Sequence, residues 1–428
     1  MSSMVRKSLY SPRIYAVALG LGVGFVMPGG AAAQEWAGGN DLVARQPAAI
    51  EAAIARWETL QASRTHSFAD YAGFVLAYPS FPRIEILKLR AEAALDNEAP
   101  PQAELLRYFD AHPPLTNPAR ARYALALAAM QRPEALTEAR RAWRGGQMSD
   151  PVELYISGLY GAQFGPEDHA VRIDALLWQG KADAAARQLV NLAEADRPLA
   201  MARLALLRGS RPEAAGIIVP QGAEADPGYV FNLVKHLRAT GQNGEAARVF
   251  TNRPDFVRPA VDAEAFVGQL LGLAEDVGAR DAANIAARTG DLFAPGTDLS
   301  ETSFTLRDRL TDLMWLGGTK ALWDLGDGTA AAPLFARYGD AAKTPLTKAK
   351  GYFWAGRAAR QAGDQTGAAR WFEMAAQWPE YYYGQLALSA LGRPMPAFAG
   401  LAQPAMDASV RAEFEARPTV QAIRALAR

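Results

Sequence analysis

The sequence predicts an all-α protein in which helix hairpins stack into one superhelical α-solenoid. Three observations support this fold class. The chain has 428 residues, half of them hydrophobic, so it can bury a large core. Alanine is abundant, which favours helices that approach one another closely. Val and Ile do not alternate over any long run after the N-terminus, so the signals for β-strands are weak.

The first 33 residues have the three-part pattern of a secretory signal peptide. Arg6, Lys7 and Arg13 form a basic region, the run 14–27 is apolar, and small residues end at Ala33. The apolar run is shorter than the ~20 residues that span a bilayer. We therefore expect cleavage near Ala33 and an exported, periplasmic product without a later membrane span. An uncleaved membrane anchor is the alternative.

Helical periodicity then begins and continues along the chain. In the first amphipathic segment, 48–61, Ile50 and Ile54 lie at helical spacing. The next unit breaks at Pro79 and Pro82, after which a new helix is expected. Further alanine-rich helices alternate with Gly or Pro punctuation. We expect the hairpins to fill 34–395, after the signal peptide.

Four helix-to-helix turns share one rule. Each helix is expected to end at a glycine in the left-handed conformation, and a pair of alanines follows in the return helix. The four glycines are Gly180, Gly241, Gly278 and Gly363. The alanine pairs are Ala184-Ala185, Ala246-Ala247, Ala282-Ala283 and Ala368-Ala369. The irregular spacing of these turns differs from a regular tetratricopeptide array, although the stacking physics is the same.

The least regular part of the chain, 298–339, contains two tryptophans eight residues apart. Trp315 and Trp323 are separated by Gly317-Gly318, which favours separate helices. Two interpretations follow: the tryptophans are core anchors between hairpins, or they form an aromatic platform for sugar rings. Tyr382 and Tyr383 allow the same two interpretations.

Candidate acids and ligand sites are few. Glu380 is the acid nearest to the tyrosine run, and its alternative role is a helix N-terminal charge. Asp168-His169 could suggest a general base, but capping of a helix by Asp168 is favoured because no nucleophile motif accompanies it. The segment 324–328 lacks the spacing and final Glu of an EF-hand calcium loop. No catalytic, cofactor-binding or metal-ligating residue is predicted.

Composition excludes other classes of protein. Lysine and arginine balance aspartate and glutamate at 45 each, without the basic excess of a nucleic-acid-binding surface. The absence of cysteine excludes a disulfide framework and thiolate metal sites. The histidines form no ligand motif: His66, His112, His169 and His236. We therefore expect neither nucleic acid nor a bound cofactor.

Three segments, in this order, resemble the helical superhelix of the soluble lytic murein transglycosylases. The first is AYPSFPRIEILKLRAEAAL at 77–95, with its Y-P-x-x-P break. The second is DHAVRIDALLWQGKADAAARQL at 168–189. The third and most specific, at 344–392, contains YFWAGRAA, AARWFEMAA and YYYGQLA. The resemblance covers most of 41–395.

The resemblance implies a U- or ring-shaped scaffold whose glycan-contacting aromatic candidates are Trp315, Trp323, Tyr382 and Tyr383. In that family a C-terminal lysozyme-like domain cleaves the MurNAc–GlcNAc bond of peptidoglycan non-hydrolytically, with a 1,6-anhydro product. Its acid lies in a Glu-Ser pair, and no Glu in this chain is followed by Ser. We expect residues 396–428 to begin a linker-helix region and the catalytic domain to be missing, so that this chain is itself non-catalytic.

Other functions stay open at this stage. One is a periplasmic TPR-like adaptor with a protein or peptide partner in its groove. Another is an enzyme with two carboxylates facing each other across the groove. The segment 418–428 reads as a helix opened by Pro418, with Val420, Ile423 and Ala427 along one side. Because this helix ends without a glycine cap, we expect the chain to be a truncated piece of a longer parent protein rather than to end at a natural terminus.

Overall fold

The computed structural model describes residues 47–397 and 407–427, and these residues form an all-α structure without β-strands. The predicted fold class is therefore confirmed. The predicted signal peptide at 1–33 lies outside the described residues. The division into a solenoid at 34–395 and a linker region at 396–428 stays a prediction.

The helices of the first half begin close to the proline and glycine punctuation in the sequence. Their bounds are α1 Pro47–Ala62, α2 Phe68–Ala77, α3 Ile84–Ala94, α4 Gln102–Ala111, α5 Asn117–Ala129, α6 Ala135–Arg144, α7 Asp150–Tyr160, α8 Pro166–Trp178, α9 Ala182–Gln188 and α10 Arg197–Leu207. The break at Pro79 and Pro82 separates α2 from α3, as predicted.

The second half contains longer, closely packed helices. Their bounds are α11 Pro227–Ala239, α12 Asn243–Asn252, α13 Ala263–Asp276, α14 Ala279–Ala287, α15 Phe304–Thr319, α16 Gly328–Ala341, α17 Pro345–Gln361, α18 Gln365–Ala375, α19 Tyr382–Ala390, α20 Ala408–Ala416 and α21 Pro418–Leu426. Among the helices described, none is long and apolar enough to cross a membrane.

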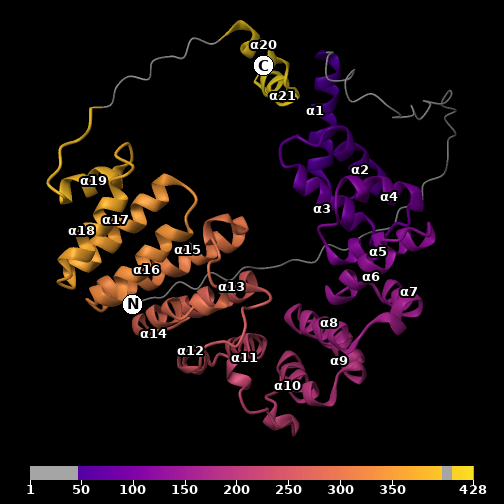
Figure 1. The fold of residues 1–428 in the computed structure, drawn as a ribbon, viewed down its shortest axis with the longest axis horizontal. Helices are drawn as coiled ribbons and strands as arrows, with labels where there is room; N and C mark the ends of the chain where they lie inside the picture. The colour runs from indigo at the N-terminus through magenta and orange to yellow at the C-terminus, as the bar shows by residue number, and fades with distance from the viewer. Residues whose placement is uncertain (1–46, 398–406, 428) are drawn as a thin grey trace, which may run out of the picture.

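The helices follow one another around an open ring (Figure 1). In that view α13 and α15 lie on the inner side of the arc, whereas α12 and α14 lie on the outer side. The hydrophobic core consists of several separate clusters of buried side chains along the arc. The largest cluster extends from Trp178 in α8 to Ala358 in α17. Each hairpin thus buries its apolar face against its neighbours, as expected for a solenoid.

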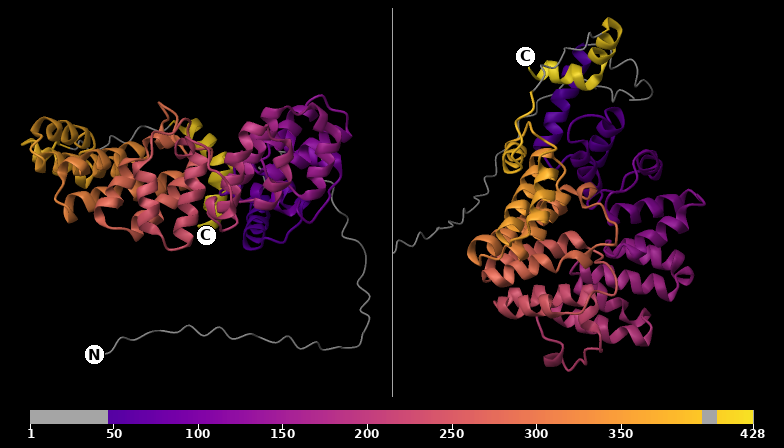
Figure 2. Two further views of the ribbon diagram at one scale, coloured as in Figure 1. Left: turned by 90° about the horizontal axis from the view of Figure 1, so that it is seen from below. Right: turned by 60° about the vertical axis from the view of Figure 1, so that its left-hand side comes forward.

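The C-terminal helix α21 packs against α1, so that the two ends of the described arc meet. Ala422 is buried in the same cluster as Ile50 and Ile54 of α1. The two helices adjoin in both views of Figure 2. Ile423 is exposed, so the buried face of α21 consists of small residues rather than the larger apolar ones.

Three of the four predicted glycine turns have the left-handed geometry. Gly180, Gly241 and Gly363 have φ values of 70°, 74° and 85°. The prediction for Gly278 is wrong, because its φ of −67° is extended and it precedes α14 as the N-cap. There Val277 ends α13 in an extended conformation, so no left-handed residue is needed. The alanines that follow are mostly buried, which allows the close helix approach.

Candidate functional site

An aromatic patch forms where α15, α16 and α17 meet. We define it as Trp315, Trp323, Tyr338, Lys350 and Trp354. The ring centroids of Trp315 lie 6.3 Å from those of both Trp323 and Trp354, and the Trp323 and Trp354 centroids lie 5.4 Å apart. All three pairs are edge-to-face, a favourable arrangement for aromatic rings. The structure therefore brings together the two tryptophans singled out in the sequence.

The expectation that Trp315 and Trp323 lie on separate helices is wrong. Helix α15 passes through Gly317 and Gly318 and runs directly into a π-helical turn, Lys320–Asp324. The glycines allow close packing rather than a turn. A Cβ on Gly317 would lie 2.5 Å from the Ala286 Cβ, and one on Gly318 would lie 2.8 Å from the Phe335 ring.

The π-helical turn presents Trp323 to solvent. This side chain is 55% exposed although it contacts two other tryptophans. Trp315 and Trp354 are half-buried beneath it. Such turns widen a helix by one residue and are frequent at functional sites. The patch thus combines a fixed aromatic base with one accessible indole face.

A lysine ammonium packs on this patch without an ionic partner. The Lys350 Nζ lies 3.5 Å from the Trp315 ring centroid and 5.3 Å from that of Tyr338. It forms no hydrogen bond or ion pair with any residue in 47–397 or 407–427. Burial lowers the pKa of Lys350, and the charge of Asp312 acts in the opposite direction. The ammonium is held by cation–π attraction, and its donors stay free for a ligand.

Tyr383 and Tyr382 lie on α19, which packs against α17. Tyr383 is half-buried, with its ring centroid 5.6 Å from that of Phe353. Tyr382 is 62% exposed and its centroid lies 5.2 Å from that of Tyr383. Burial raises the pKa of Tyr338, and the charges of Asp312 and then Tyr383 add to this shift. Tyr383 is thus a packing residue, whereas Tyr382 offers a free face.

Trp354 and Lys350 were not singled out by the sequence analysis. A signal was present, because the two residues are four apart in α17 and share one face of that helix. The segment reads as an ordinary amphipathic helix, however, and nothing in its pattern indicates that this face meets Trp315.

The candidate acids have structural roles. Asp168 is almost fully buried, accepts a hydrogen bond from the Gly165 backbone N–H (2.9 Å) and pairs with Arg144 (2.5 Å), so it caps α8 as predicted. Asp327 caps α16 through the Ala330 N–H (2.9 Å). In the part of the chain that the structure describes, no group of three His, Cys, Asp or Glu side chains could hold a metal ion.

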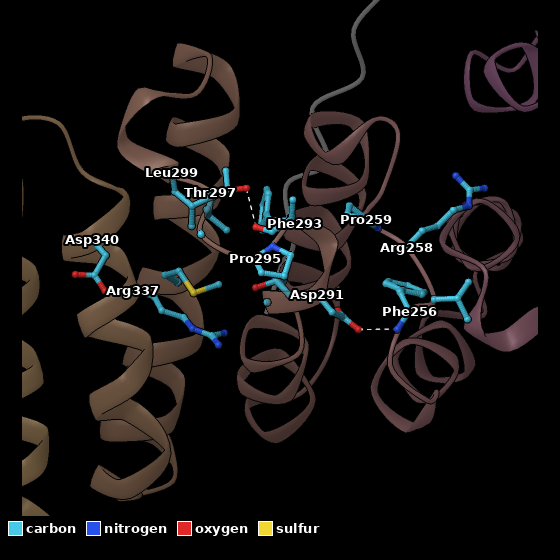
Figure 3. Close-up of a pocket in the computed structure, with 17 residues that line it drawn as sticks. Phe256, Arg258, Pro259, Asp291, Phe293, Pro295, Thr297, Leu299, Arg337 and Asp340 are labelled. Atoms are coloured by element: carbon cyan, nitrogen blue, oxygen red, sulfur yellow. Dashed lines mark hydrogen bonds between the residues drawn. The ribbon is translucent and has the colours of Figure 1, made fainter. Parts of the chain in front are cut away.

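A second feature is a pocket of about 660 Å³ at one edge of the arc (Figure 3). Its walls are the connection 253–262 between α12 and α13 and the connection 288–303 between α14 and α15. Its base is apolar and includes the buried side chains of Leu310 and Met314 from α15. The sequence analysis treated both connections only as punctuation and did not predict this pocket.

A buried ion pair joins the two walls. Arg253 donates to both carboxylate oxygens of Asp291 at 2.7 Å, and the Phe256 N–H donates to the same carboxylate at 2.9 Å. Burial acts to raise the pKa of Asp291, but these hydrogen bonds outweigh it and the pKa is lowered. The Arg253 guanidinium also stacks on the Phe256 ring, 3.4 Å from its centroid. The pocket is therefore preformed.

The other charged side chains around the pocket differ in their partners. Arg258 is neutralised by Asp174 (3.1 Å) and Asp226 (3.0 Å). Asp340 accepts a hydrogen bond from the Tyr352 hydroxyl at 2.8 Å and keeps its negative charge. Arg337 differs, because its guanidinium donates to the Ala287 carbonyl (3.0 Å) but has no carboxylate partner in the described ranges.

Comparison with known proteins found no matching family model and no matching curated protein. Two solved structures match over 90% of this chain. One is the complex of the 70-kDa soluble lytic transglycosylase with bulgecin A, at 17% identity and a TM-score of 0.40. The other is the 70-kDa soluble lytic transglycosylase Slt70 from Escherichia coli, at 15% identity and a TM-score of 0.38. The chain spans 58% of the length of each.

Proposed function

We propose that this chain is a periplasmic helical scaffold of the lytic-transglycosylase type that binds the glycan strands of peptidoglycan. The signal-peptide pattern at 1–33 supports export. The chain itself acts by binding, since it contains no Glu-Ser pair. The parent activity would be non-hydrolytic cleavage of the MurNAc–GlcNAc bond with a 1,6-anhydro product.

The observation that carries this proposal is the aromatic patch, with Trp323 exposed above two other tryptophans. A pyranose ring presents an apolar face of C–H groups and a polar rim of hydroxyls. The Trp323 indole is held in place by edge-to-face contacts with its neighbours, and its flat apolar surface matches the apolar face of the sugar. Because the side chain is already fixed, binding costs little side-chain entropy. The tryptophan packing thus supports a role in sugar stacking.

Lys350 supplies the polar complement to this stacking surface. Its ammonium has three N–H donors, and cation–π contact with Trp315 leaves them without acceptors in the described residues. Hydroxyl and N-acetyl oxygens of a glycan are suitable acceptors. A few polar groups beside an aromatic surface are typical of sites that orient a ligand.

The exposed Tyr382 extends the proposed contact surface to α19, because that helix packs against α17, which carries Trp354. A surface spread over α15, α17 and α19 suits a linear polymer better than a single small molecule. Trp315 would act as the base of this surface rather than as a direct contact.

The test is co-sedimentation of the purified protein with peptidoglycan sacculi, supported by titration with soluble chitooligosaccharides. Trp323→Ala should weaken binding about five- to 150-fold, in line with ~1–3 kcal/mol for an aromatic stacking contact. Tyr155→Ala is a matched control, because Tyr155 is 65% exposed on α7, outside the patch. Equal binding by both variants would overturn the proposal.

A further inference from the structure

We propose that the pocket between the connections 253–262 and 288–303 binds the C-terminal end of an extended peptide whose last residues are apolar. This inference is independent of the proposed glycan binding, because the pocket uses none of the five patch residues. It assigns a second ligand class, a peptide carboxylate, to a different surface of α15 and α16.

Among the charged side chains of the pocket, Arg337 is the one suited to bind a carboxylate. Asp340, on the same helix, keeps its charge and lies on the side of Arg337 away from Asp291 (Figure 3). Asp291 and Arg258 are neutralised by partners within the chain, as described above. Arg337 extends into the pocket from α16 (Figure 3) and has only a backbone carbonyl as its partner in the described part of the chain. A guanidinium is planar and has five N–H donors, so the remaining donors match a carboxylate in a fixed orientation.

A glycine makes room for this arginine. A Cβ at Gly290 would lie 3.2 Å from the Arg337 Nη2 atom. Since Gly290 has an ordinary backbone conformation, the close approach of the guanidinium is what a side chain there would disturb. The guanidinium therefore lies directly against the 288–303 wall, beside the backbone of the apolar residues that follow.

That wall also offers a main-chain hydrogen bond. Phe293 is extended, with φ −113° and ψ 152°, and its N–H group has no partner among the described residues. A free N–H group on an extended residue can pair with a carbonyl of an extended peptide. A simple fatty acid has no carbonyl beyond its carboxylate that could accept this hydrogen bond.

The remaining surface is suited to apolar side chains. Leu310 and Met314 form the base, and Phe293 and Pro295 extend it along the wall. The volume of about 660 Å³ lies within the ~300–1,000 Å³ range of ligand sites. The carboxylate, the peptide backbone and the final apolar side chains thus each have a separate partner.

Isothermal titration calorimetry on the full chain tests this assignment. The probes are an acetylated tripeptide ending in two leucines with a free carboxylate, the same peptide as a carboxamide, and decanoate. The carboxamide should bind about tenfold more weakly, because it lacks the charge-assisted hydrogen bond to Arg337. Arg337→Gln should remove the difference between the two peptides. Ala294→Trp should abolish binding by filling the pocket from an exposed position.

Arg280→Gln is the matched control, since Arg280 is an exposed arginine on α14 outside the pocket. It should bind the peptide like the unmodified protein, and circular dichroism should show that all variants are folded. Equal affinity for carboxylate and carboxamide, binding of decanoate as tight as that of the peptide, or no binding would each overturn the assignment. None of these outcomes bears on glycan binding, which is measured through Trp323.

Discussion

Of the cations that lie over a tryptophan ring, Arg172 and Lys350 differ most clearly in what surrounds them. Arg172 lies 4.1 Å from the Trp143 ring centroid, is fully buried, and pairs with Glu153 at 2.9 Å. It also donates to the Gly146 carbonyl at 2.7 Å. Lys350 contacts Trp315 at a similar distance but is only half-buried and has no such partners in the described residues.

The difference shows how one kind of contact can serve two purposes. In the first region, the guanidinium joins three helices, because Arg172 lies on α8 and its partners Trp143 and Glu153 lie on α6 and α7. Removing it would leave a buried carboxylate without its main partner. In the second region, the ammonium closes no network, so its removal would leave the helices in place. We therefore expect stability to depend on Arg172 and binding to depend on Lys350.

The largest expected effect is the loss of stability in Arg172→Ala. It should cost about 3 kcal/mol, because Glu153, which is largely buried, keeps only Arg187 at 3.6 Å as an ionic partner and a hydrogen bond from Gln188 at 2.7 Å. Urea unfolding followed by circular dichroism would measure this change. Arg280→Ala, at an exposed position, is the control and should be neutral. A loss of stability below about 0.5 kcal/mol would show that Arg172 does not have the structural role assigned to it here.

The next largest effect is the change in stability when a side chain is added at Gly317, where α15 packs closely against a neighbouring helix. Gly317→Ala should destabilise by about 1–3 kcal/mol through overpacking, since its Cβ would meet Ala286 at 2.5 Å. Gly73→Ala in α2, where no atom lies within 4 Å of the added Cβ, should instead stabilise by about 0.5–1 kcal/mol. Opposite signs in thermal or urea unfolding would confirm that Gly317 serves packing. Stabilisation in both would refute it.

A smaller effect is expected for Lys350→Met, and it should appear in binding rather than in stability. The affinity for peptidoglycan should fall about three- to tenfold, while stability changes by less than about 1 kcal/mol. Lys350→Arg should keep most of the binding, because it preserves a cation over Trp315. If Lys350→Met were as unstable as Arg172→Ala, the two regions would have the same structural role.

The sequence was sufficient for the fold class and for several helix breaks, such as that at Pro79 and Pro82, because proline, glycine and apolar spacing act locally. Three of its four predicted left-handed turns are confirmed, and it identified Trp315 and Trp323. It did not predict that Gly317 and Gly318 lie within a helix, since their need for space arises from Ala286 and Phe335 on other helices. The Arg253–Asp291 pair and the pocket were also missed, because they join residues 38 positions apart.

The smallest expected effect tests the electrostatics of the patch. Burial raises the pKa of Asp312, the charges of Asp308 and Glu275 raise it further, and Lys350 partly offsets these effects. A folded-state pKa above the ordinary aspartate value of 3.8 means that the folded protein binds this proton more tightly than the unfolded chain does. The ionised carboxylate therefore reduces stability above the folded pKa, and this cost is absent below pH 3.8.

Asp312→Asn should accordingly be more stable than the unmodified protein near pH 7, and the difference should disappear as the pH falls to about 3. The measurement is the urea midpoint of both proteins across this range. In a Lys350→Met background the gain from Asp312→Asn should be larger, because the favourable charge of Lys350 on this carboxylate would be absent. A gain that is independent of pH, or equal in both backgrounds, would show that Asp312 and Lys350 are not coupled, and the free ammonium of the patch would need another explanation.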